Sequence, residues 1–392
     1  PVKTDYKFLG WEPESIPTDS TGNVTFTAKW DANTAELLSG QEITVKMKKL
    51  TGKRSASYDS EDTAITAIQW SDEAPSDTVM ADKNSLISTN KSGKPVYAWF
   101  EGGTIKWWSD AEYVNAGSDL SYLCYDMKNL TDISGLTDFQ TDNTNMSYMF
   151  WGCDQLTDLT PLANWQTGNV TNMEQMFVGC SQLTDLTPLA NWQTGKVANM
   201  SAMFQGCKLT NPTPLANWKT DNVTNMSRMF AGCSQLTDLT PLANWQTGKV
   251  TSTSYMFAGC SQLTDLTPLT NWQTGNVTNM SEMFQYCSQL TNLTPLENWD
   301  TSNVTDMSGV FHECSMLNLQ ALEKWDVSNV TSMRDMFYGC SKLTDASAID
   351  DWDISKVEKS NFNSMFYGCP SHPTFTKRAG RWRSNGTFIP TT

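Results

Sequence analysis

Histidine, basic residues and long apolar runs are scarce in this chain, and each scarcity excludes a class of protein. The 392 residues include 2 histidines, and 27 lysines and arginines stand against 42 acidic residues, for a net charge of −15. Nucleic-acid binding depends on clustered basic side chains, so this balance argues against nucleic acid and against anionic membrane surfaces. No apolar run approaches the ~20 residues of a membrane-spanning helix, so no membrane insertion is expected.

The sequence also lacks the short motifs on which common catalytic sites depend. It has no P-loop, no paired-glycine dinucleotide fingerprint and no nucleophile elbow. Neither His312 nor His372 lies in a triad or zinc spacing, and no C-x-x-C pair is present. We therefore expect a non-catalytic protein with no cofactor and no metal site.

Self-similarity is what the chain has in abundance. Nine cysteines, from Cys153 to Cys369, mark successive copies of a segment at steps of 26 to 29 residues, with apolar residues at every third position. An amphipathic helix would show steps of three and four, and a strand would show steps of two. A period of about 20 to 50 residues is typical of a solenoid, in which stacked copies bury what one copy cannot. The predicted tryptophan ladder starts at Phe139 and continues through Trp165, Trp192, Trp218, Trp245, Trp272, Trp299, Trp325 and Trp352.

Each copy contains three recognisable segments. We expect Leu-Thr-Asp-Leu, for example 236–239, to form a strand that pairs with its neighbours at a spacing of about 4.8 Å. The proline of Thr-Pro-Leu should end that strand because it has no amide donor. The Asn-Met-Ser-x-Met-Phe segment is expected to form one short helical turn.

The copy resembles the repeat of BspA-like leucine-rich-repeat bacterial surface proteins. The resemblance rests on Asn-Val-Thr-Asn-Met-Ser-x-Met-Phe-x-Gly-Cys-Ser-x-Leu-Thr, as in residues 276–291 with Tyr286 in place of glycine. That family implies a leucine-rich-repeat-like solenoid at the cell surface, often linked to adhesion, without a fixed ligand. The predicted fold is mainly β with short helical turns: a parallel-sheet ladder with a β-rich N-terminal cap and a C-terminal hairpin.

Residues 1–30 resemble the closing half of a Listeria–Bacteroides (internalin B-type) repeat, a small β module of Gram-positive surface proteins. The resemblance rests on YKFLGW at 6–11 and VTFTAKW at 24–30. Because the opening half of that module, a leader and an anchor are all missing, we expect a fragment of a longer protein. Together the resemblances imply a secreted, extracellular Gram-positive protein that is anchored to the cell wall in its full-length form.

The remaining residues are predicted to form three further units. Residues 31–117 should be a β-rich domain that caps the first copy, with strands at 42–50, 63–70 and 96–108 and a hairpin at Gly102-Gly103. Residues 118–372 form the predicted solenoid. Residues 373–392 should cap its other end as a hairpin of 374–376 and 387–389 around Asn385-Gly386.

Two columns of reactive side chains run along the copies. Nine of the 10 cysteines share one column, and parallel side chains lack the facing geometry of a disulfide, so free buried thiols are expected. An acidic column either carries solubilising charge or bridges calcium, although one column supplies few oxygen ligands. Its members are Asp158, Asp185, Asp238, Asp265 and Asp345.

Surface variation between copies marks candidate binding positions. In x-Met-Phe-x-Gly-Cys the two x positions change while the apolar columns stay fixed, so we interpret them as free of the fold and open to selection by a ligand. Aromatic side chains at both ends could stack on a sugar or anchor a protein. The candidate ligand-binding residues are Tyr148, Trp151, Arg228, Tyr255, His312, Tyr338 and Tyr367.

The leading hypothesis is a monomeric adhesion module that binds a host or neighbouring-cell protein or glycoprotein. A long array with a broad surface, together with the family resemblance, favours it. The alternative is a passive stalk that displays a distal binding domain. Near-identical copies favour the stalk, because a specific site breaks the symmetry of a repeat.

Overall fold

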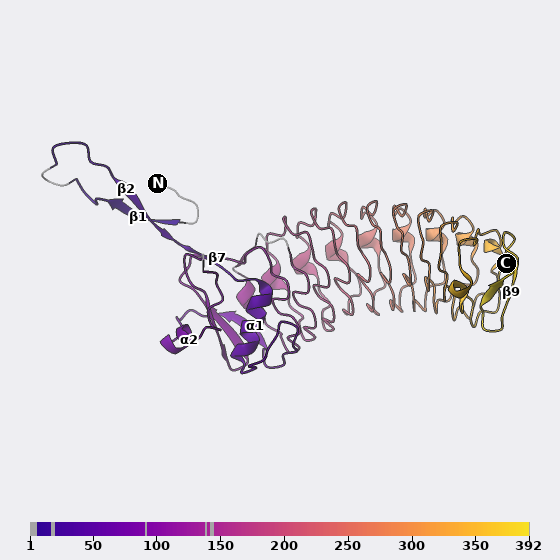
Figure 1. Cartoon of the computed structure of the whole chain (residues 1–392), viewed down its shortest axis with the longest axis horizontal. Helices are drawn as coiled ribbons and strands as arrows, with labels where there is room; N and C mark the ends of the chain where they lie inside the picture. The colour runs from indigo at the N-terminus through magenta and orange to yellow at the C-terminus, as the bar shows by residue number, and fades with distance from the viewer. Residues whose placement is uncertain (1–5, 17–19, 91, 138, 142–144, 392) are drawn as a thin grey trace.

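The computed structural model describes residues 6–16, 20–90, 92–137, 139–141 and 145–391. Within these ranges it consists of short strands, two α-helices and regularly spaced 3-10 helices, which is consistent with a repeat fold. Figure 1 shows a projecting N-terminal hairpin, a mixed region around α1, and a row of coils that ends at the C-terminus. No helix in the described part of the chain is long and apolar enough to cross a membrane.

An antiparallel hairpin opens the described chain. It pairs β1 (Tyr6–Glu12) with β2 (Thr27–Ala32) and projects away from the other elements (Figure 1). The strands expected near the start of the chain are therefore present. The family of this module stays a prediction, and residues 1–5 and 17–19 of it lie outside the described ranges.

The sheet of the N-terminal region contains the predicted hairpin. β5 (Tyr97–Glu101) and β6 (Thr104–Trp108) are antiparallel around the turn at Gly102-Gly103. β4 (Ala67–Trp70), within the predicted strand 63–70, joins β6 in parallel. Alternate residues of β6 are buried, and Trp107 is fully enclosed.

A helix, α1 (Gly40–Leu50), occupies the segment predicted as a strand at 42–50, so that prediction was wrong. Ser39 and Glu42 form a capping box, in which the hydroxyl accepts the N–H of Glu42 and the carboxylate accepts the N–H of Ser39. Ile43 and Met47, one helical turn apart, are fully buried. A second, short helix is α2 (Asp77–Ala81), capped by the Ser76 hydroxyl.

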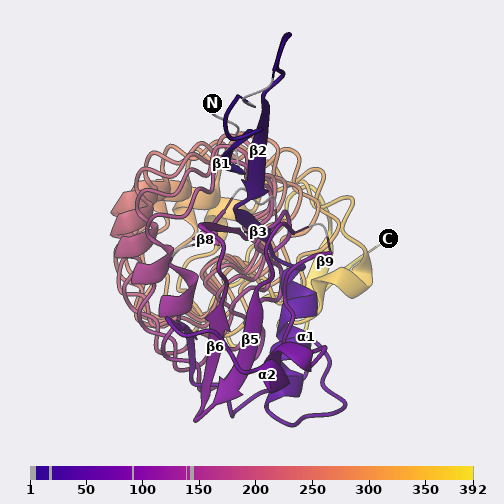
Figure 2. The ribbon, with the colours of Figure 1, turned by 90° about the vertical axis from the view of Figure 1, so that its left-hand side faces the viewer.

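The N-terminal region continues directly into the coils. β3 (Thr34–Glu36), β7 (Tyr113–Asn115) and β8 (Phe139–Gln140) form a parallel sheet, and β8 belongs to the first coil. The Phe139 ring lies 4.9 Å from the Trp107 ring, so the aromatic column extends into the region before the copies. Figure 2 shows β5, β6 and α1 in front of the lower part of the coils.

The Thr-Pro-Leu segments form 3-10 helices, and no strand forms at 236–239 or at the matching segments of the other copies. Proline suits the first turn because its φ is fixed and its missing N–H is not needed there. Asp238 precedes the helix and accepts the N–H of Thr240 at 2.8 Å, which makes a turn where a strand was predicted. The 3-10 helices are η1 (Ser134–Leu136), η2 (Thr160–Leu162), η3 (Thr187–Leu189), η4 (Thr213–Leu215), η5 (Thr240–Leu242), η6 (Thr267–Leu269), η7 (Thr294–Leu296), η8 (Gln320–Leu322), η9 (Ser347–Ile349) and η10 (Lys359–Phe362).

Copies are joined mainly through Asn-Met-Ser-x-Met-Phe-x-Gly, which we call the ladder segment. The N–H groups of Met146, Tyr148, Phe150 and Gly152 donate to carbonyls of the next copy at 2.7–2.9 Å. Every second N–H thus points toward the following copy. Each ladder segment also contains two residues of positive φ, at the first x and at the glycine, which excludes the predicted helical turn.

Ladders of apolar side chains fill the interior, as predicted. The tryptophans from Trp165 to Trp352 are buried, and Trp245 Nε1–H donates to the Leu215 carbonyl of the preceding copy at 3.2 Å. The phenylalanine rings stack at centroid distances of 5.5–5.9 Å between Phe150 and Phe337. These contacts repeat from copy to copy, so each copy is held by its two neighbours.

The cysteine column has its own hydrogen bonds. Each of its thiols donates to a backbone carbonyl of the preceding copy, as Cys260 does to Phe230 at 3.3 Å. All ten cysteines of the chain are free thiols, and Cys369 is the one that is partly exposed. Burial raises the pKa of Cys233 and Cys287 to about 12.

The C-terminal hairpin closes the last ladder segment. β9 (Gly380–Trp382) pairs with β10 (Phe388–Pro390), so the strand predicted at 387–389 is present and the one at 374–376 is not. With no further copy to accept them, the N–H of Ser364 donates to Thr387 Oγ1 and that of Phe366 to the Gly386 carbonyl. A Cβ at Gly386 would lie 2.2 Å from the Phe366 backbone, so this turn requires glycine.

Replacing Thr253 by Met should stabilise the protein. Thr253 stands in the buried methionine column, and its Oγ1 has no hydrogen-bond partner among the described residues. The substitution removes an unsatisfied hydroxyl and adds buried apolar surface, so we expect a gain of about 1–2 kcal/mol in the free energy of unfolding by urea denaturation. The converse variant Met226→Thr should lower the free energy of unfolding by a similar amount. If Thr253→Met also lowered it, the assignment of Thr253 to the buried methionine column would be contradicted.

Thiol labelling should separate the native and unfolded states. In the folded protein at pH 8 the buried thiols remain protonated because burial raises their pKa, so we expect labelling of Cys369 at most. After denaturation without reductant, mass spectrometry should count all ten thiols. Detection of several disulfides would contradict the assignment of the cysteine column as free thiols.

Candidate binding face

The first x position of the ladder segment is constrained by the backbone. Its residue has positive φ in every copy, from Tyr148 (59°) to Ser364 (51°). This left-handed conformation costs roughly 1–2 kcal/mol for a residue other than glycine. The prediction that these positions are free of the fold was therefore wrong for the first x. The second x has no such constraint, because its φ is negative.

Tyr148 and Trp151 lie in an aromatic cluster that spans the seam between the N-terminal region and the first copies. The Tyr148 ring stacks on Tyr122 at 4.8 Å, and the Trp151 ring stacks on Tyr125 at 4.7 Å. Tyr58, from the N-terminal region, packs edge-on against Tyr122 at 4.9 Å. The faces of these rings are occupied within the chain, so the cluster serves to join two parts of the fold.

Two lysines complete this seam. The Lys48 side chain is fully buried; its ammonium donates to the carbonyls of Tyr58, at 2.8 Å, and Ser60. Burial lowers the pKa of Lys48 to about 8. The Lys128 ammonium lies 5.8 Å from the centre of the Trp151 ring. Lys128 thus engages Trp151, one of the rings that the sequence suggested as a ligand contact, whereas the Lys48 ammonium lies 5.7 Å from the centre of the Tyr125 ring.

Arg228 and Tyr255 contact each other in the middle of the face. The guanidinium of Arg228 lies 4.5 Å from the centre of the Tyr255 ring, and the Tyr255 hydroxyl donates to Glu282. Burial and the Glu282 carboxylate together raise the pKa of Tyr255. The ring and the hydroxyl of Tyr255 are therefore both engaged within the chain.

His312, Tyr338 and Tyr367 are brought together at the C-terminal end, with Tyr286 beside them. These four side chains, here called the aromatic row, come from four consecutive copies and have centroid distances of 5.1, 4.6 and 4.8 Å in chain order. Tyr286 is 50% exposed and Tyr367 45%. His312, Tyr338 and Tyr367 stack with interplanar angles of 16° and 19°, so between them the rings offer mainly edges to solvent.

Tyr286 and Glu313 are the residues of this face that sequence reasoning missed as site candidates. Both occupy the glycine position of the ladder segment, with φ of 58° and 59°, where the other copies from Gly152 to Gly368 carry glycine. The signal was in the sequence: two consecutive copies depart from an otherwise regular glycine. Its meaning required knowledge that this position has positive φ.

The acidic column is turned toward its own backbone. Asp185 and Asp265 each accept the N–H of the threonine two residues later at 2.8 Å, and hydrogen bonds from that threonine lower the pKa of both carboxyls. Asn211 and Asn292 make the same contact in their copies at 3.0 Å. No group of three or more histidine, cysteine or acidic side chains in the described part of the chain could hold a metal ion. These contacts account for the column as turn-forming residues.

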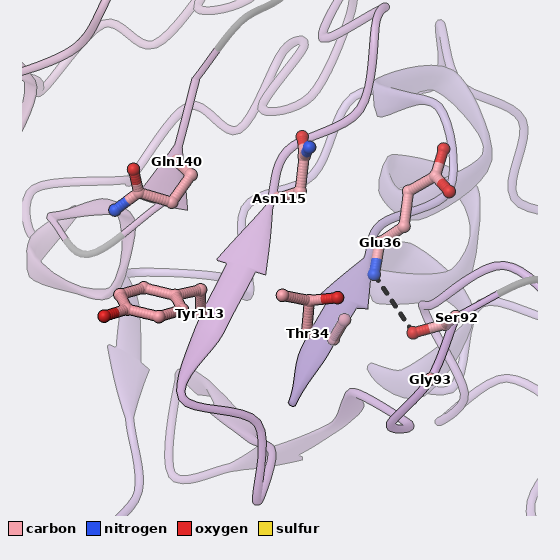
Figure 3. A pocket seen from close by; sticks show the side chains of 8 residues that line it. Thr34, Glu36, Ser92, Gly93, Tyr113, Asn115 and Gln140 are labelled. Atoms are coloured by element: carbon pink, nitrogen blue, oxygen red, sulfur yellow. Dashed lines mark hydrogen bonds between the residues drawn. The ribbon is translucent and has the colours of Figure 1, made fainter. Parts of the chain in front are cut away.

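A separate hollow of about 430 Å³ lies along the β3–β7–β8 sheet (Figure 3). Tyr113, Asn115 and Gln140 line it, and the Glu36 N–H donates to Ser92 Oγ at 3.0 Å on its other side. The lining consists mainly of amide, hydroxyl and backbone groups. None of the residues predicted from the sequence to bind a ligand lies there.

The regular coils and their ladders place this chain among the repeat proteins. It belongs to the family described as "Mycoplasma protein of unknown function, DUF285", whose matches cover residues 118–237, 201–294 and 288–385. None of the curated proteins compared with the chain matches it. The matched residues cover the copies and part of the C-terminal hairpin, and the family description names no activity or ligand.

Asp265→Ala should destabilise the protein, whereas Asp265→Asn should not. Alanine removes the acceptor for the Thr267 N–H, a loss of about 0.5–2 kcal/mol by comparison with helix caps; asparagine keeps it, as Asn211 and Asn292 do. Because the pKa of Asp265 is lowered from 3.8, its charge-dependent contribution is present at neutral pH and is lost as the pH falls through the lowered value. Urea denaturation near neutral pH and at about pH 3 should show that acid lowers the free energy of unfolding less for Asp265→Asn than for the wild type. Equal losses in the two proteins would contradict a stabilising role of the Asp265 carboxylate in this turn.

Proposed function

We propose that the repeat array is a leucine-rich-repeat-like solenoid of the BspA-like kind and that it works as a non-catalytic binding module at a bacterial surface. Its partner is a host or neighbouring-cell protein. The parallel bridges between copies, the continuous apolar columns and the covered ends support the solenoid. The residues of each ladder segment and the sequence resemblance support the family placement.

The observation that carries the binding role is the aromatic row. Structural columns keep one residue type through the array, whereas Tyr286, His312, Tyr338 and Tyr367 interrupt outward positions occupied elsewhere mostly by glycine, alanine, valine or glutamine. Large aromatic side chains are favoured anchors of protein interfaces. Their partial exposure on four consecutive copies offers a continuous contact surface that the fold does not require.

A protein partner is favoured over a glycan by the orientation of the rings. Sugars stack on the open faces of aromatic side chains, but Tyr338, inside the row, is stacked with the rings of both neighbouring copies. The N-terminal cluster is likewise stacked on itself. Exposed edges with hydroxyl groups suit the mixed polar and apolar contacts of a protein interface.

A passive stalk is the second candidate, and the middle copies favour it. From Cys153 to Cys260 the copies are near-identical, and small or neutral side chains such as Val178, Gln205 and Ala231 occupy the second x. We propose that these copies act mainly as a spacer, while the C-terminal copies carry recognition.

A binding screen distinguishes the two functions. The whole chain, immobilised at its N-terminus, should bind saturably to a member of a panel of host surface and secreted proteins, with no saturable signal on a glycan array. The variant Tyr338→Ala/Tyr367→Ala should lose the signal at an unchanged fold by circular dichroism, and the matched pair Val178→Ala/Gln205→Ala should keep it. Silence on every probe would leave the stalk as the function of this chain.

A further inference from the structure

We infer that the aromatic row, together with the Glu313 carboxylate, binds an extended, arginine-containing segment of the partner protein. This inference rests on the proposed binding function and adds the chemistry of what is bound. It depends on three features of the surface: two residues that keep a positive φ where the other copies have glycine, acidic side chains that lie over glycines of the following copy, and the length of the row.

The first feature is the backbone at Tyr286 and Glu313. The ladder segment requires positive φ at this position, and Gly152, Gly179, Gly206, Gly232 and Gly259 satisfy it without steric cost. A tyrosine and a glutamate in two consecutive copies keep the same φ, at 58° and 59°, and so accept a less favourable conformation. The first x position carries such residues in nearly every copy, but at the glycine position only these two copies from Gly152 to Gly368 do, so Tyr286 and Glu313 depart from the pattern of their own column.

The second feature is the placement of the carboxylates. The Glu313 carboxylate lies over Gly339. A Cβ added at position 339 would lie 2.6 Å from the carboxylate carbon of Glu313. The Glu282 side chain likewise lies over Gly309, because a Cβ added at position 309 would lie 2.7 Å from Glu282 Cγ. Glycine at 309 and 339 thus leaves the space in which each acidic side chain lies across the following copy. Among the described residues, no basic side chain makes an ion pair with Glu313, so its charge is available to a partner.

The third feature is the length of the surface. Four consecutive copies at about 4.8 Å separation span roughly 14 Å, which matches four to five residues of an extended chain at about 3.3 Å each. The rings of the row stack along the array, so an occupant that contacts all four must lie parallel to the array. A folded domain touching a single point would not need four aromatic residues in line.

Charge selects the residue type of this segment. With a net charge of −15 the protein repels acidic partners, and an exposed carboxylate beside aromatic edges favours a cation. The planar guanidinium of arginine can form two parallel hydrogen bonds to the Glu313 carboxylate while its flat surface contacts the phenol edges. An ammonium group provides the charge without that geometry, so lysine should bind more weakly than arginine.

The test uses the whole chain and a panel of immobilised peptides of equal length that are rich in arginine, lysine, neutral residues or glutamate. We expect saturable binding that is strongest for arginine and is weakened by added salt. Tyr286→Gly/Glu313→Gly restores the regular glycine at both positions and should weaken binding at least tenfold while leaving the melting temperature unchanged or raising it. Glu313→Gln, which keeps the backbone strain and removes the charge, should abolish the preference for arginine over neutral peptides.

A matched control comes from another copy. Gln205→Ala changes the same exposed face away from the row and should leave binding unchanged. Wild-type binding by the double glycine variant, or a preference for neutral or acidic peptides, would overturn the inference. If a partner found in the protein screen binds the double glycine variant as tightly as the wild type, this inference fails while the proposed binding function stands; if no protein or peptide binds at all, both fail.

Discussion

The structure depends on the backbone hydrogen bonds of the ladder segment, most of which run toward the next copy. Within each ladder segment every second N–H donates to the next copy and every second carbonyl accepts from the previous one. Such a ladder leaves unpaired carbonyls at its first copy and unpaired N–H groups at its last, and buried orphans are costly. Both ends of the ladder are covered by segments that approach its backbone closely at a glycine. At the first copy the Gly40 N–H donates to the Asp119 carbonyl, and at the last copy the Gly386 carbonyl accepts the Phe366 N–H.

The side-chain columns follow from this backbone. Carbonyls that the ladder does not use are satisfied from within: the Trp245 indole donates to Leu215 and the Cys260 thiol to Phe230, and the same pairs recur along the array. Cysteine suits its column because it is small and apolar yet carries a weak donor. The buried threonine of Gln-Thr-Gly has a similar use, since Thr247 Oγ1 donates to the Gln273 carbonyl at 3.1 Å and also accepts the Gln273 N–H at 2.8 Å.

The same backbone decides where the surface can vary. The glycine and first x positions must adopt positive φ, so a large side chain there opposes the local preference, whereas the second x is open to substitution. The N-terminal aromatic residues stack across a seam, and the central Arg228–Tyr255 pair is internally satisfied. The C-terminal copies differ, because there aromatic and acidic residues stay exposed on a surface that the ladder does not need.

The sequence by itself determined the repeat, its apolar columns, the hairpin at Gly102-Gly103 and the turn at Asn385-Gly386, because burial periodicity and turn-forming residues are local properties. The sequence-based prediction was wrong at α1. The alternating apolar and polar residues of EITVKMKKL are also typical of a strand, but the capping box formed by Ser39 and Glu42 favours a helix. Only the tertiary structure decided which segment of a copy carries the hydrogen bonds and which of the predicted aromatic residues meet. Those outcomes depend on φ values and on neighbours about 27 residues away, which no local pattern in one copy contains.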